Sequence, residues 1–416
     1  MYNKVTRSVL TSNLLHFIRW TCISVVMGIL CSLVGTAFGH SVAFSQKYFK
    51  THGYMLYLMP VSGILIALIH KAFHQVGNKG TNLILESISS RETIHFSTLP
   101  CIFSSTVLSH LVGASAGKEG AALQIGGCIG NLLGDLLKMD ERDKKVAIMS
   151  GMSGCFGAIF GTPLAAAMFG MEVISVGVAY YAALVPCVFS SFIGAYMSRR
   201  LGLHPEAFTI LEIPDFHWNT AAYTILLGLL AALVSVCFCI LLHESQKLYK
   251  KKIENIYLRI LTASGLFIIL TLIFGRDYCG AGFNLVEEAM AGRVPCEAFL
   301  LKMLFTAVAL GGGFKGGEIV PTLAVGAALG AAFGNLLGFA PSLCAACGML
   351  SLFVGVTNCP VATMFMGFEL FGFEAMPYFA IIVAISFTLS GYYGLYSSQK
   401  FTYSKTRTEF INRKAH

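Results

Sequence analysis

Long apolar segments follow one another along this chain, with very little polar sequence between them. They lie near 20–40, 53–70, 93–113, 121–137, 145–174, 176–198, 220–242, 258–275, 297–312, 317–338, 341–372 and 376–396. A helix of roughly 20 apolar residues crosses a bilayer, and it bonds its backbone polar groups internally. The composition agrees, because 56% of the residues are hydrophobic, 12% are charged and the mean hydropathy is +0.71. The chain is therefore predicted to be an all-α polytopic membrane protein.

The start of the chain is predicted to lie on the membrane rather than to be a leader peptide. The apolar segment from Trp20 to Phe38 is too long for the core of a signal peptide and lacks a small-residue cleavage site. Residues 1–19 combine leucines with Arg7 and Arg19. This pattern predicts an amphipathic helix on the cytoplasmic surface.

The positive charge is placed where membrane topology would use it. The chain has 29 Lys and Arg against 21 Asp and Glu, a net charge of +8. The basic residues cluster in short loops, at Lys47 and Lys50, 142–144, 199–200, 247–252 and 413–414. Such loops orient membrane proteins through the positive-inside rule. Since no groove of basic and aromatic residues is visible, nucleic acid is not an expected partner.

The cysteines and histidines are expected to have structural roles. Thirteen cysteines are scattered mostly through apolar spans, which is typical of small buried side chains. Cys344-Ala-Ala-Cys347 has a redox or metal spacing, but it lies in an apolar segment with no second pair. We expect no metal site and no cofactor. His70, His74 and His110 lie near span ends and are expected to be interface residues.

The two halves of the chain repeat each other. The segment from Pro163 to Glu172 aligns with the segment from Pro360 to Glu369 at an offset of 197, and Lys118 falls on Lys315 at the same offset. Gly130-Asn-Leu-Leu-Gly134 recurs as Gly334-Asn-Leu-Leu-Gly338. Internal duplication with glycine- or proline-broken spans is the pattern of transporters that bind substrate at mid-membrane between two repeats.

We predict repeats at 20–205 and 220–398, joined by a link at 206–219. A cytoplasmic tail, 399–416, is too short for a regulatory domain. The matching glutamates Glu172 and Glu369 are expected to serve helix ends rather than transport.

One glycine-rich stretch carries an acid at membrane depth. Residues 113–127 read G-A-S-A-G-K-E-G-A-A-L-Q-I-G-G and contain Glu119. An intramembrane carboxylate is costly and is therefore expected to be functional. The residues from Ala121 onward can open a helix, whose N-terminus binds anions through unpaired N–H groups. An anion site with a carboxylate beside it is the prediction. The alternative is a structural salt bridge between Glu119 and Lys118, but adjacent residues on a helix face apart.

The same stretch permits a different class of function. Gly113-Ala-Ser115-Ala-Gly117 matches the G-x-S-x-G pattern of serine hydrolases. An intramembrane hydrolase would also need a histidine as general base on a neighbouring span. The histidines downstream lie in links, at span edges or in the tail. An enzyme is therefore not expected.

Four motifs together resemble one family. G-K-E-G-A at 117–121 is similar to the gating-glutamate motif of the CLC superfamily of anion channels and transporters. G-G-E-I-V-P at 316–321 resembles its second anion loop, and Leu395-Tyr396-Ser397 its last-helix tyrosine. The segment 163–172 resembles the family sequence before the inner glutamate. The resemblance spans the whole transmembrane chain and implies two inverted-topology repeats of broken, tilted helices in a homodimer, with one pathway per subunit.

Within the superfamily, the bacterial fluoride/proton antiporter branch is the most similar. Chloride-type members carry G-S-G-I-P where this chain has Gly80-Thr81-Asn82-Leu83-Ile84. The Asn-Leu-Ile ending and Gly313-Phe-Lys-Gly-Gly-Glu318 resemble the fluoride branch. Thr81 and Val320 differ from the residues usual in that branch. The inner proton glutamate of chloride exchangers falls on Val173.

The resemblance implies a set of site residues. The gating and proton-coupling residue is Glu119. The anion-binding residues are Gly80, Thr81, Asn82, Gly117, Lys118, Gly120, Gly317, Glu318, Ile319, Val320 and Tyr396. Phe314 is a possible lining residue of the pathway, or else packing.

Three of these side chains keep a second interpretation. Thr81 can donate its hydroxyl to the anion and can cap a helix that starts near Leu83, and the two roles are compatible. Tyr396 is a phenolic donor or an interfacial tyrosine. Glu318 either relays protons or fixes its loop.

The expected function is proton-coupled export of fluoride across a bacterial cytoplasmic membrane. Ionised Glu119 would occupy the anion position itself, and protonation would release it. The alternatives are a passive chloride or fluoride channel and a chloride/proton exchanger. The remote alternative is the hydrolase using Ser115. The expected partners are a small inorganic anion, protons, lipid and a second copy of the chain.

Overall fold

Helices make up nearly all of the fold. The computed structural model describes residues 2–90, 92–204 and 207–416. The helices of the first half are α1 Tyr2–Thr51, η1 Gly53–Leu58, α2 Met59–Ala72, α3 Thr81–Ser90, α4 Thr98–Leu111, α5 Glu119–Leu136, α6 Glu141–Phe160, α7 Pro163–Glu172, η2 Tyr181–Ala183 and α8 Leu184–Arg200. Those of the second half are α9 Trp218–Lys252, α10 Ile256–Phe274, α11 Phe283–Met290, α12 Ala298–Gly312, α13 Ile319–Leu337, α14 Pro341–Thr357, α15 Pro360–Phe371 and α16 Met376–Leu389. The predicted all-α polytopic class is confirmed.

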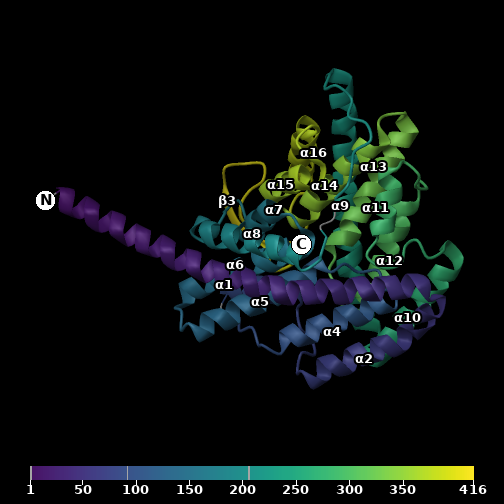
Figure 1. Ribbon diagram of the computed structural model, residues 1–416. Helices are drawn as coiled ribbons and strands as arrows, with labels where there is room; N and C mark the ends of the chain where they lie inside the picture. Colours follow the sequence, from purple (N-terminus) through teal and green to yellow (C-terminus); the bar gives the residue numbers. More distant parts are fainter. Residues whose placement is uncertain (1, 91, 205–206) are drawn as a thin grey trace.

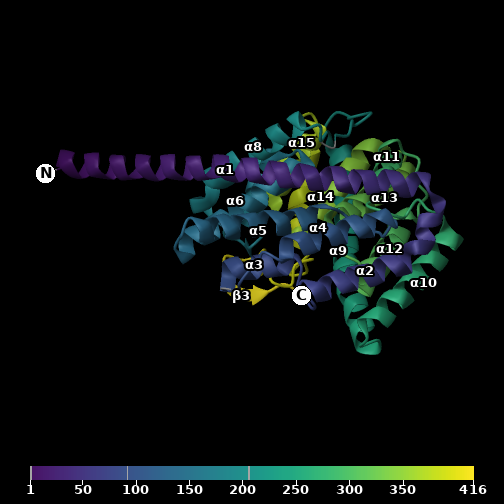
Figure 2. The same ribbon diagram turned by 60° about the horizontal axis from the view of Figure 1, so that its bottom comes forward.

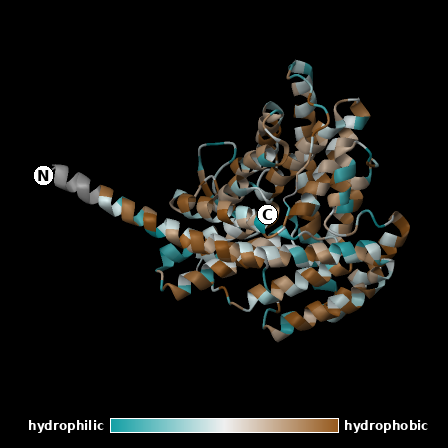
Figure 3. Ribbon diagram, in the orientation of Figure 1, coloured by the Kyte–Doolittle hydropathy of each residue, from teal (hydrophilic) through white to brown (hydrophobic). Residues whose placement is uncertain are grey.

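Six helical stretches of the described chain are long and apolar enough to span a membrane. They are Leu10–Thr51, Gly53–Ala72, Tyr181–Arg200, Trp218–Lys252, Ile256–Phe274 and Ile319–Leu337. The outer faces of these helices carry exposed apolar side chains such as Leu65 on α2 and Ile269 on α10. Figure 3 shows hydrophobic residues along both helices. A bilayer would cover these faces.

Two predicted spans are each split into two helices. The segment 145–174 is divided between α6 and α7, and the segment 341–372 between α14 and α15. Gly161 and Asn358 end the first helix of each pair with left-handed backbone, at φ +78° and +59°. A proline then starts the next helix, where its missing N–H costs nothing. The prediction of single spans was wrong because hydropathy continues across both breaks.

Three further elements differ from the sequence prediction. The short helix α11 was not predicted. α3 begins at Thr81 rather than near Leu83. α1 continues without a break through the predicted amphipathic segment into the first span. Figures 1 and 2 show its N-terminal part extending beyond the body, while its later part packs on α4, α6 and α8. Residue 1 and the boundary predicted between residues 205 and 206 lie outside the described residues.

The segment predicted as a tail is folded. β2, Lys400–Tyr403, pairs in parallel with β1, Ser175–Val176, and antiparallel with β3, Phe410–Lys414. The end of the chain is thereby attached to the first repeat just after α7. This small sheet was not expected, because its strands show no clear alternation of apolar and polar residues.

Each repeat contains the same close helix pair. In the first, α5 crosses α6 where Gly126 and Gly130 face Gly151. In the second, α13 crosses α14 where Gly326 and Gly330 face the backbone around Cys344 and Gly348. A Cβ atom on any of these α5 and α13 glycines would collide with backbone of the facing helix. Glycines spaced by four residues let the two backbones touch, which is how membrane helices associate tightly.

Gly330→Ala is expected to lower the stability of the folded protein by about 1–3 kcal/mol, because the new methyl group collides with backbone that cannot rotate away. The measurement is the thermal unfolding midpoint of the purified protein in detergent. Gly265→Ala in α10 is the matched control, since a Cβ there meets no atom within 4 Å. Equal midpoints for the two variants would contradict this account of the helix crossing.

Candidate functional site

Motifs from both repeats meet at one cavity. It has a volume of about 320 Å³. The predicted residues that line it are Gly80, Thr81, Asn82, Phe314, Glu318 and Tyr396. The charged and polar residues that also line it include Lys79, Glu86, Gln124, Lys250, Arg259, Lys315 and Ser398. Segments more than 300 residues apart in the sequence thus share one cavity.

The two glycine loops are joined directly behind this cavity. The N–H of Gly117 donates to the carbonyl of Gly317 at 2.6 Å, and the N–H of Gly317 donates back at 2.7 Å. Gly120 lies against Gly317, where a Cβ would fall 2.9 Å from the Gly317 Cα. Two loops that correspond across the repeats therefore form a single backbone unit. Glycine is required because no side chain fits between them.

Glu119 is the first residue of α5 and is fully buried. Its Oε2 accepts from the backbone N–H of Lys118 at 3.0 Å. The helix therefore starts two residues earlier than predicted, and the acid lies at its N-terminus. The dipole and the N–H groups of that end stabilise negative charge. The side chain of Lys118 does not line the cavity; its Nζ lies 5.5 Å from the centre of the Phe283 ring.

Thr81 does not act as a helix cap through its side chain. Its hydroxyl donates to the carbonyl of Gly120 at 3.3 Å, across the site rather than along α3. Gln124 of α5, which the sequence analysis missed, donates to the Thr81 hydroxyl at 3.4 Å and to the Gly120 carbonyl at 3.1 Å. The capping interpretation is therefore wrong. The available sequence signal was a polar residue, Gln124, in the apolar run that follows Glu119.

Tyr396 is a cavity residue and not an interfacial tyrosine. Only 2% of its surface is exposed, and its buried hydroxyl has no hydrogen-bond partner among the described residues. Its segment is held by two neighbours. The N–H of Leu395 donates to Val356, and the N–H of Ser398 donates to Asn82 Oδ1 at 2.9 Å. An unpaired buried donor at a cavity is suited to an anion.

Tyr396→Phe is expected to weaken anion binding about tenfold while leaving the fold intact, since the hydroxyl contributes no protein hydrogen bond. Anion affinity measured by calorimetry and the unfolding midpoint together separate the two effects. Tyr392→Phe is the control, because the Tyr392 hydroxyl bonds Ser404 outside the cavity. Unchanged affinity in the Tyr396 variant would remove this residue from the site.

The second-repeat loop supplies an acid and an aromatic ring. Glu318 precedes α13 and lines the cavity, and a Cβ on Gly120 would lie 3.7 Å from its Oε2. Phe314 also lines the cavity, with 2% of its surface exposed. Ile319 and Val320 open α13, are fully buried and do not line the cavity. Their place is at the helix end rather than on the pathway wall.

The cavity is electropositive. Lys250, Arg259 and Lys315 line it and form no ion pair within the described part of the chain. Lys79 is paired with Glu86 at 2.5 Å and with Glu92 at 3.1 Å. Unpaired cations around a cleft with low-dielectric walls raise the local anion concentration.

The paired glutamates Glu172 and Glu369 lie elsewhere and cap each other's repeats. Glu172 accepts from the N–H groups of Val361 and Ala362, at 3.2 and 3.0 Å. Glu369 accepts from those of Leu164 and Ala165, at 2.8 and 2.9 Å. Each carboxylate closes the N-terminus of the helix in the other repeat. Val173 follows Glu172 and is buried, and its carbonyl accepts from Gln399.

Ser115 is held in a structural contact. Its side chain is fully buried, and its hydroxyl shares a 2.9 Å hydrogen bond with the hydroxyl of Thr306. Thr306 in turn donates to the Lys302 carbonyl. The serine therefore faces α12 and not a histidine. Among the described residues, no group of three His, Cys, Asp or Glu side chains could hold a metal ion.

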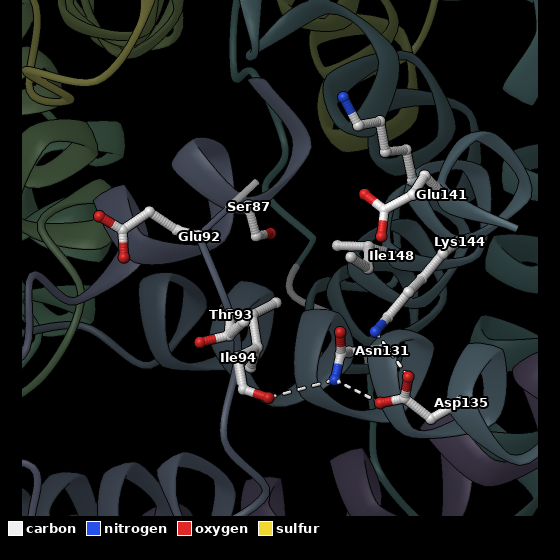
Figure 4. Close-up of a pocket in the computed structure, with 10 residues that line it drawn as sticks. Ser87, Glu92, Thr93, Ile94, Asn131, Asp135, Glu141, Lys144 and Ile148 are labelled. Carbon is white, nitrogen blue, oxygen red and sulfur yellow. Dashed lines mark hydrogen bonds and ion pairs between the residues drawn. The ribbon is translucent and has the colours of Figure 1, made fainter. Parts of the chain in front are cut away.

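A second pocket, of about 170 Å³, lies between the end of α3 and the α5–α6 turn. Figure 4 shows three of its polar side chains, those of Asn131, Asp135 and Lys144, joined by hydrogen bonds or an ion pair. Lys144 is paired with Asp135 at 2.6 Å, and Asn131 donates to Asp135 and to the Ile94 carbonyl. These groups are partnered within the protein. The pocket is separate from the cavity of Thr81 and Tyr396.

Comparison with known proteins agrees with this geometry. The sequence model of the voltage-gated chloride channel family matches residues 62–391. The chain belongs to the CLC family. CLC proteins are transporters or channels and not enzymes, so the hydrolase alternative is set aside.

Individual relatives give the same assignment. A chloride/fluoride channel protein of Pseudomonas syringae pv. tomato is 32% identical over 403 residues, which are 94% of this chain and 88% of the relative. An H⁺/Cl⁻ exchange transporter of Vibrio cholerae is 26% identical over 84% of this chain and 81% of its own.

Solved structures show the same fold. The crystal structure of a CLC-type fluoride/proton antiporter superposes with a TM-score of 0.88 at 29% identity, covering 92% of this chain and 98% of that one. A cyanobacterial Cl⁻/H⁺ antiporter superposes with a TM-score of 0.73 at 19% identity, covering 89% of this chain and 94% of its own. The CLC fold of two inverted repeats with broken helices is therefore established. The chain is a CLC anion transporter or channel.

Proposed function

We propose that this CLC protein exports fluoride in exchange for protons. The observation that carries the proposal is the position of Glu119. It lies buried at the N-terminus of α5, in the loop joined to Gly317, next to a cavity lined by Thr81, Glu318 and Tyr396. Anion donors and a titratable acid occur together there.

The mechanism is a competition for one position. Ionised Glu119 is held by the helix N-terminus, where a small anion would also bind. Protonation removes the charge, so the side chain leaves and the anion enters. Since a proton and an anion alternate at this position, their movements become coupled. Glu318, facing the cavity close to Gly120, is the acid through which we propose that imported protons pass from Glu119 to the cavity.

Fluoride is supported over chloride by two kinds of observation. The fluoride/proton antiporter superposes with a TM-score of 0.88 and the Cl⁻/H⁺ antiporter with 0.73. Val173 is apolar at the position where chloride exchangers carry an inner acid; it is fully buried, and its carbonyl accepts from the Gln399 amide. The proton route therefore runs through the cavity and not past Val173.

Coupling gives a useful gradient. Moving one elementary charge across 100 mV is worth about 2.3 kcal/mol. Export of one anion with import of one proton moves two charges, so about 4.6 kcal/mol, or roughly three decades of concentration, is available. A passive channel reaches about half as many decades. Fluoride re-enters cells as neutral HF, which makes the steeper gradient valuable.

We further propose the membrane placement and assembly. The basic end of α9 includes Lys250, which lines the cavity. The positive-inside rule places this end, and with it the cavity mouth, on the cytoplasmic side of the cell membrane. Two copies of the chain form a homodimer with one pathway in each subunit, as the family resemblance implies.

The test imposes a fluoride gradient across proteoliposomes containing the full-length protein and follows fluoride and pH together. Chloride is run in parallel. Fluoride-driven proton movement is expected. Fluoride flux without proton flux would instead establish a passive channel, and preferred chloride-driven proton movement would establish a chloride/proton exchanger.

A further inference from the structure

A small side chamber opens beside the main cavity. Its volume is about 20 Å³, enough for one water-sized species. It shares Asn78, Gly80, Ile102, Gln124 and Lys315 with the lining of the main cavity. The residues that belong to the chamber alone are His70, Thr98 and Cys101. Lys315 therefore stands where the two spaces meet.

His70 is not an interface residue as the sequence suggested. It is 5% exposed, and its Nδ1 lies 3.1 Å from the carbonyl of Gln75. A carbonyl only accepts, so Nδ1 carries the hydrogen. The buried Nε2 has no hydrogen-bond partner among the described residues. Neutral His70 thus presents a lone pair through Nε2, and protonated His70 presents an N–H donor.

Lys315 supplies the positive charge. No described carboxylate lies within ion-pair distance of it, although Glu318 follows on the same loop. The neutral donors of the chamber are mostly used within the protein. Gln124 bonds Thr81 and Gly120, Asn78 bonds Gln75, and the Gly80 N–H bonds Asn78. The ammonium of Lys315 and the Nε2 of His70 are the groups left for a ligand.

We propose that this chamber binds one monatomic anion of fluoride size between Lys315 and His70, and that His70 takes up one proton from solvent as the anion enters. The proposal rests on the proposed fluoride function and adds a second site to it. The anion accepts from the Lys315 ammonium and from the new Nε2–H, both charge-assisted bonds.

The small volume of the chamber favours fluoride over chloride. Fluoride is close to water in size, whereas chloride is larger and overfills a space for one water. Backbone and side-chain donors alone do not separate the two ions. A narrow chamber with one lysine and one histidine does, because the larger ion would push apart α2, α4 and the loop before α13.

Few other groups can titrate there. Besides His70 of α2, the ionisable groups lining the chamber are Cys101 of α4 and Lys315. α5 contributes the neutral Gln124, and the loop after α2 contributes the neutral Asn78. Arg259 of α10 lines the main cavity and not the chamber. Proton uptake with fluoride is therefore assigned to His70.

The experiment is calorimetric titration of fluoride into purified full-length Glu119→Gln protein, which removes the central titrating group. Two buffers of different ionisation enthalpy count the protons taken up per anion. Proton uptake on fluoride binding is expected, with tighter binding at lower pH. In Glu119→Gln/His70→Gln the uptake should be lost and fluoride affinity should fall about tenfold, the loss of one charge-assisted bond. Lys315→Met in the same background should weaken fluoride similarly.

Controls make each outcome decisive. His74→Gln and Lys71→Met change exposed residues that are close to His70 in the sequence and do not line the chamber, and they should behave like the parent. Chloride titrated into the His70→Gln, His74→Gln and Lys71→Met variants should bind the central site unchanged within about twofold, which also shows that each of these variants is folded. Undiminished proton uptake in the His70 variant, or equal loss of chloride and fluoride binding, would overturn the proposal. Failure of the proposed antiport would show separately, as absent fluoride-driven proton movement in the wild-type protein.

Discussion

Glu119→Gln should abolish proton movement driven by a fluoride gradient, reducing it about 100-fold or more, because an amide cannot carry the transported proton. Glutamine keeps the size of the side chain and can still contact the N–H of Lys118. The fold is therefore expected to survive. The measurement is pH inside proteoliposomes during fluoride efflux, with fluoride followed in the same sample.

Glu287→Gln is the control for this experiment, since Glu287 lies exposed on α11. It should leave both fluxes unchanged. Fluoride movement that persists in Glu119→Gln without protons would identify the acid as the coupling element. Intact coupling in that variant would instead assign the proton to another residue, and Glu318 would be the first to examine.

Much of the central site follows from local sequence. Glycine on both sides of Glu119 indicated close backbone approach, and the apolar run after it indicated a helix N-terminus. The structure adds the partner, because the Gly117–Gly317 pairing joins positions 200 residues apart. Lys315 was matched to Lys118 by the repeat, but its place between two cavities was not predictable. Long-range juxtaposition depends on packing, which a single sequence does not encode locally.

Other features of the fold were not predicted from the sequence, for identifiable physical reasons. Hydropathy is continuous through Pro163 and Pro360, so single spans were predicted where the chain has two helices. His70 sits at a helix end, which suggested an interface, yet the fold buries it. The strands β2 and β3 arise from pairing with β1 and not from their own pattern. For His70 and for the two strands, a tertiary contact overrides the local signal.

For the matched glutamates Glu172 and Glu369, the sequence indicated a role at helix ends but not which backbone groups they bind. Their symmetry suggested helix-end structure. The structure shows that each carboxylate accepts two N–H groups at the start of the opposite proline helix. α7 and α15 pack together. Nearby, the ring centroids of Phe169 on α7 and Phe353 on α14 lie 5.9 Å apart across the two repeats. The two carboxylates thus fasten one repeat to the other.

Glu172→Ala is expected to destabilise the protein by about 2–3 kcal/mol, since the N–H groups of Val361 and Ala362 lose a charged acceptor in a buried setting. Glu369→Ala should do the same for Leu164 and Ala165. The double variant is expected to deviate from additivity, because both caps lie at one helix interface. Thermal unfolding in detergent measures all three.

Transport distinguishes this structural role from a proton relay. Glu172→Gln keeps one acceptor oxygen, so it should recover part of the lost stability and retain the wild-type ratio of protons to fluoride. Glu374→Ala, at an exposed acid just beyond α15, supplies the control and should not change the midpoint. If Glu172→Gln had the wild-type unfolding midpoint but carried fluoride without protons, the residue would belong to the proton route instead. The reciprocal caps predict the opposite, with stability lowered and coupling kept, because each carboxylate is occupied by the backbone of the other repeat.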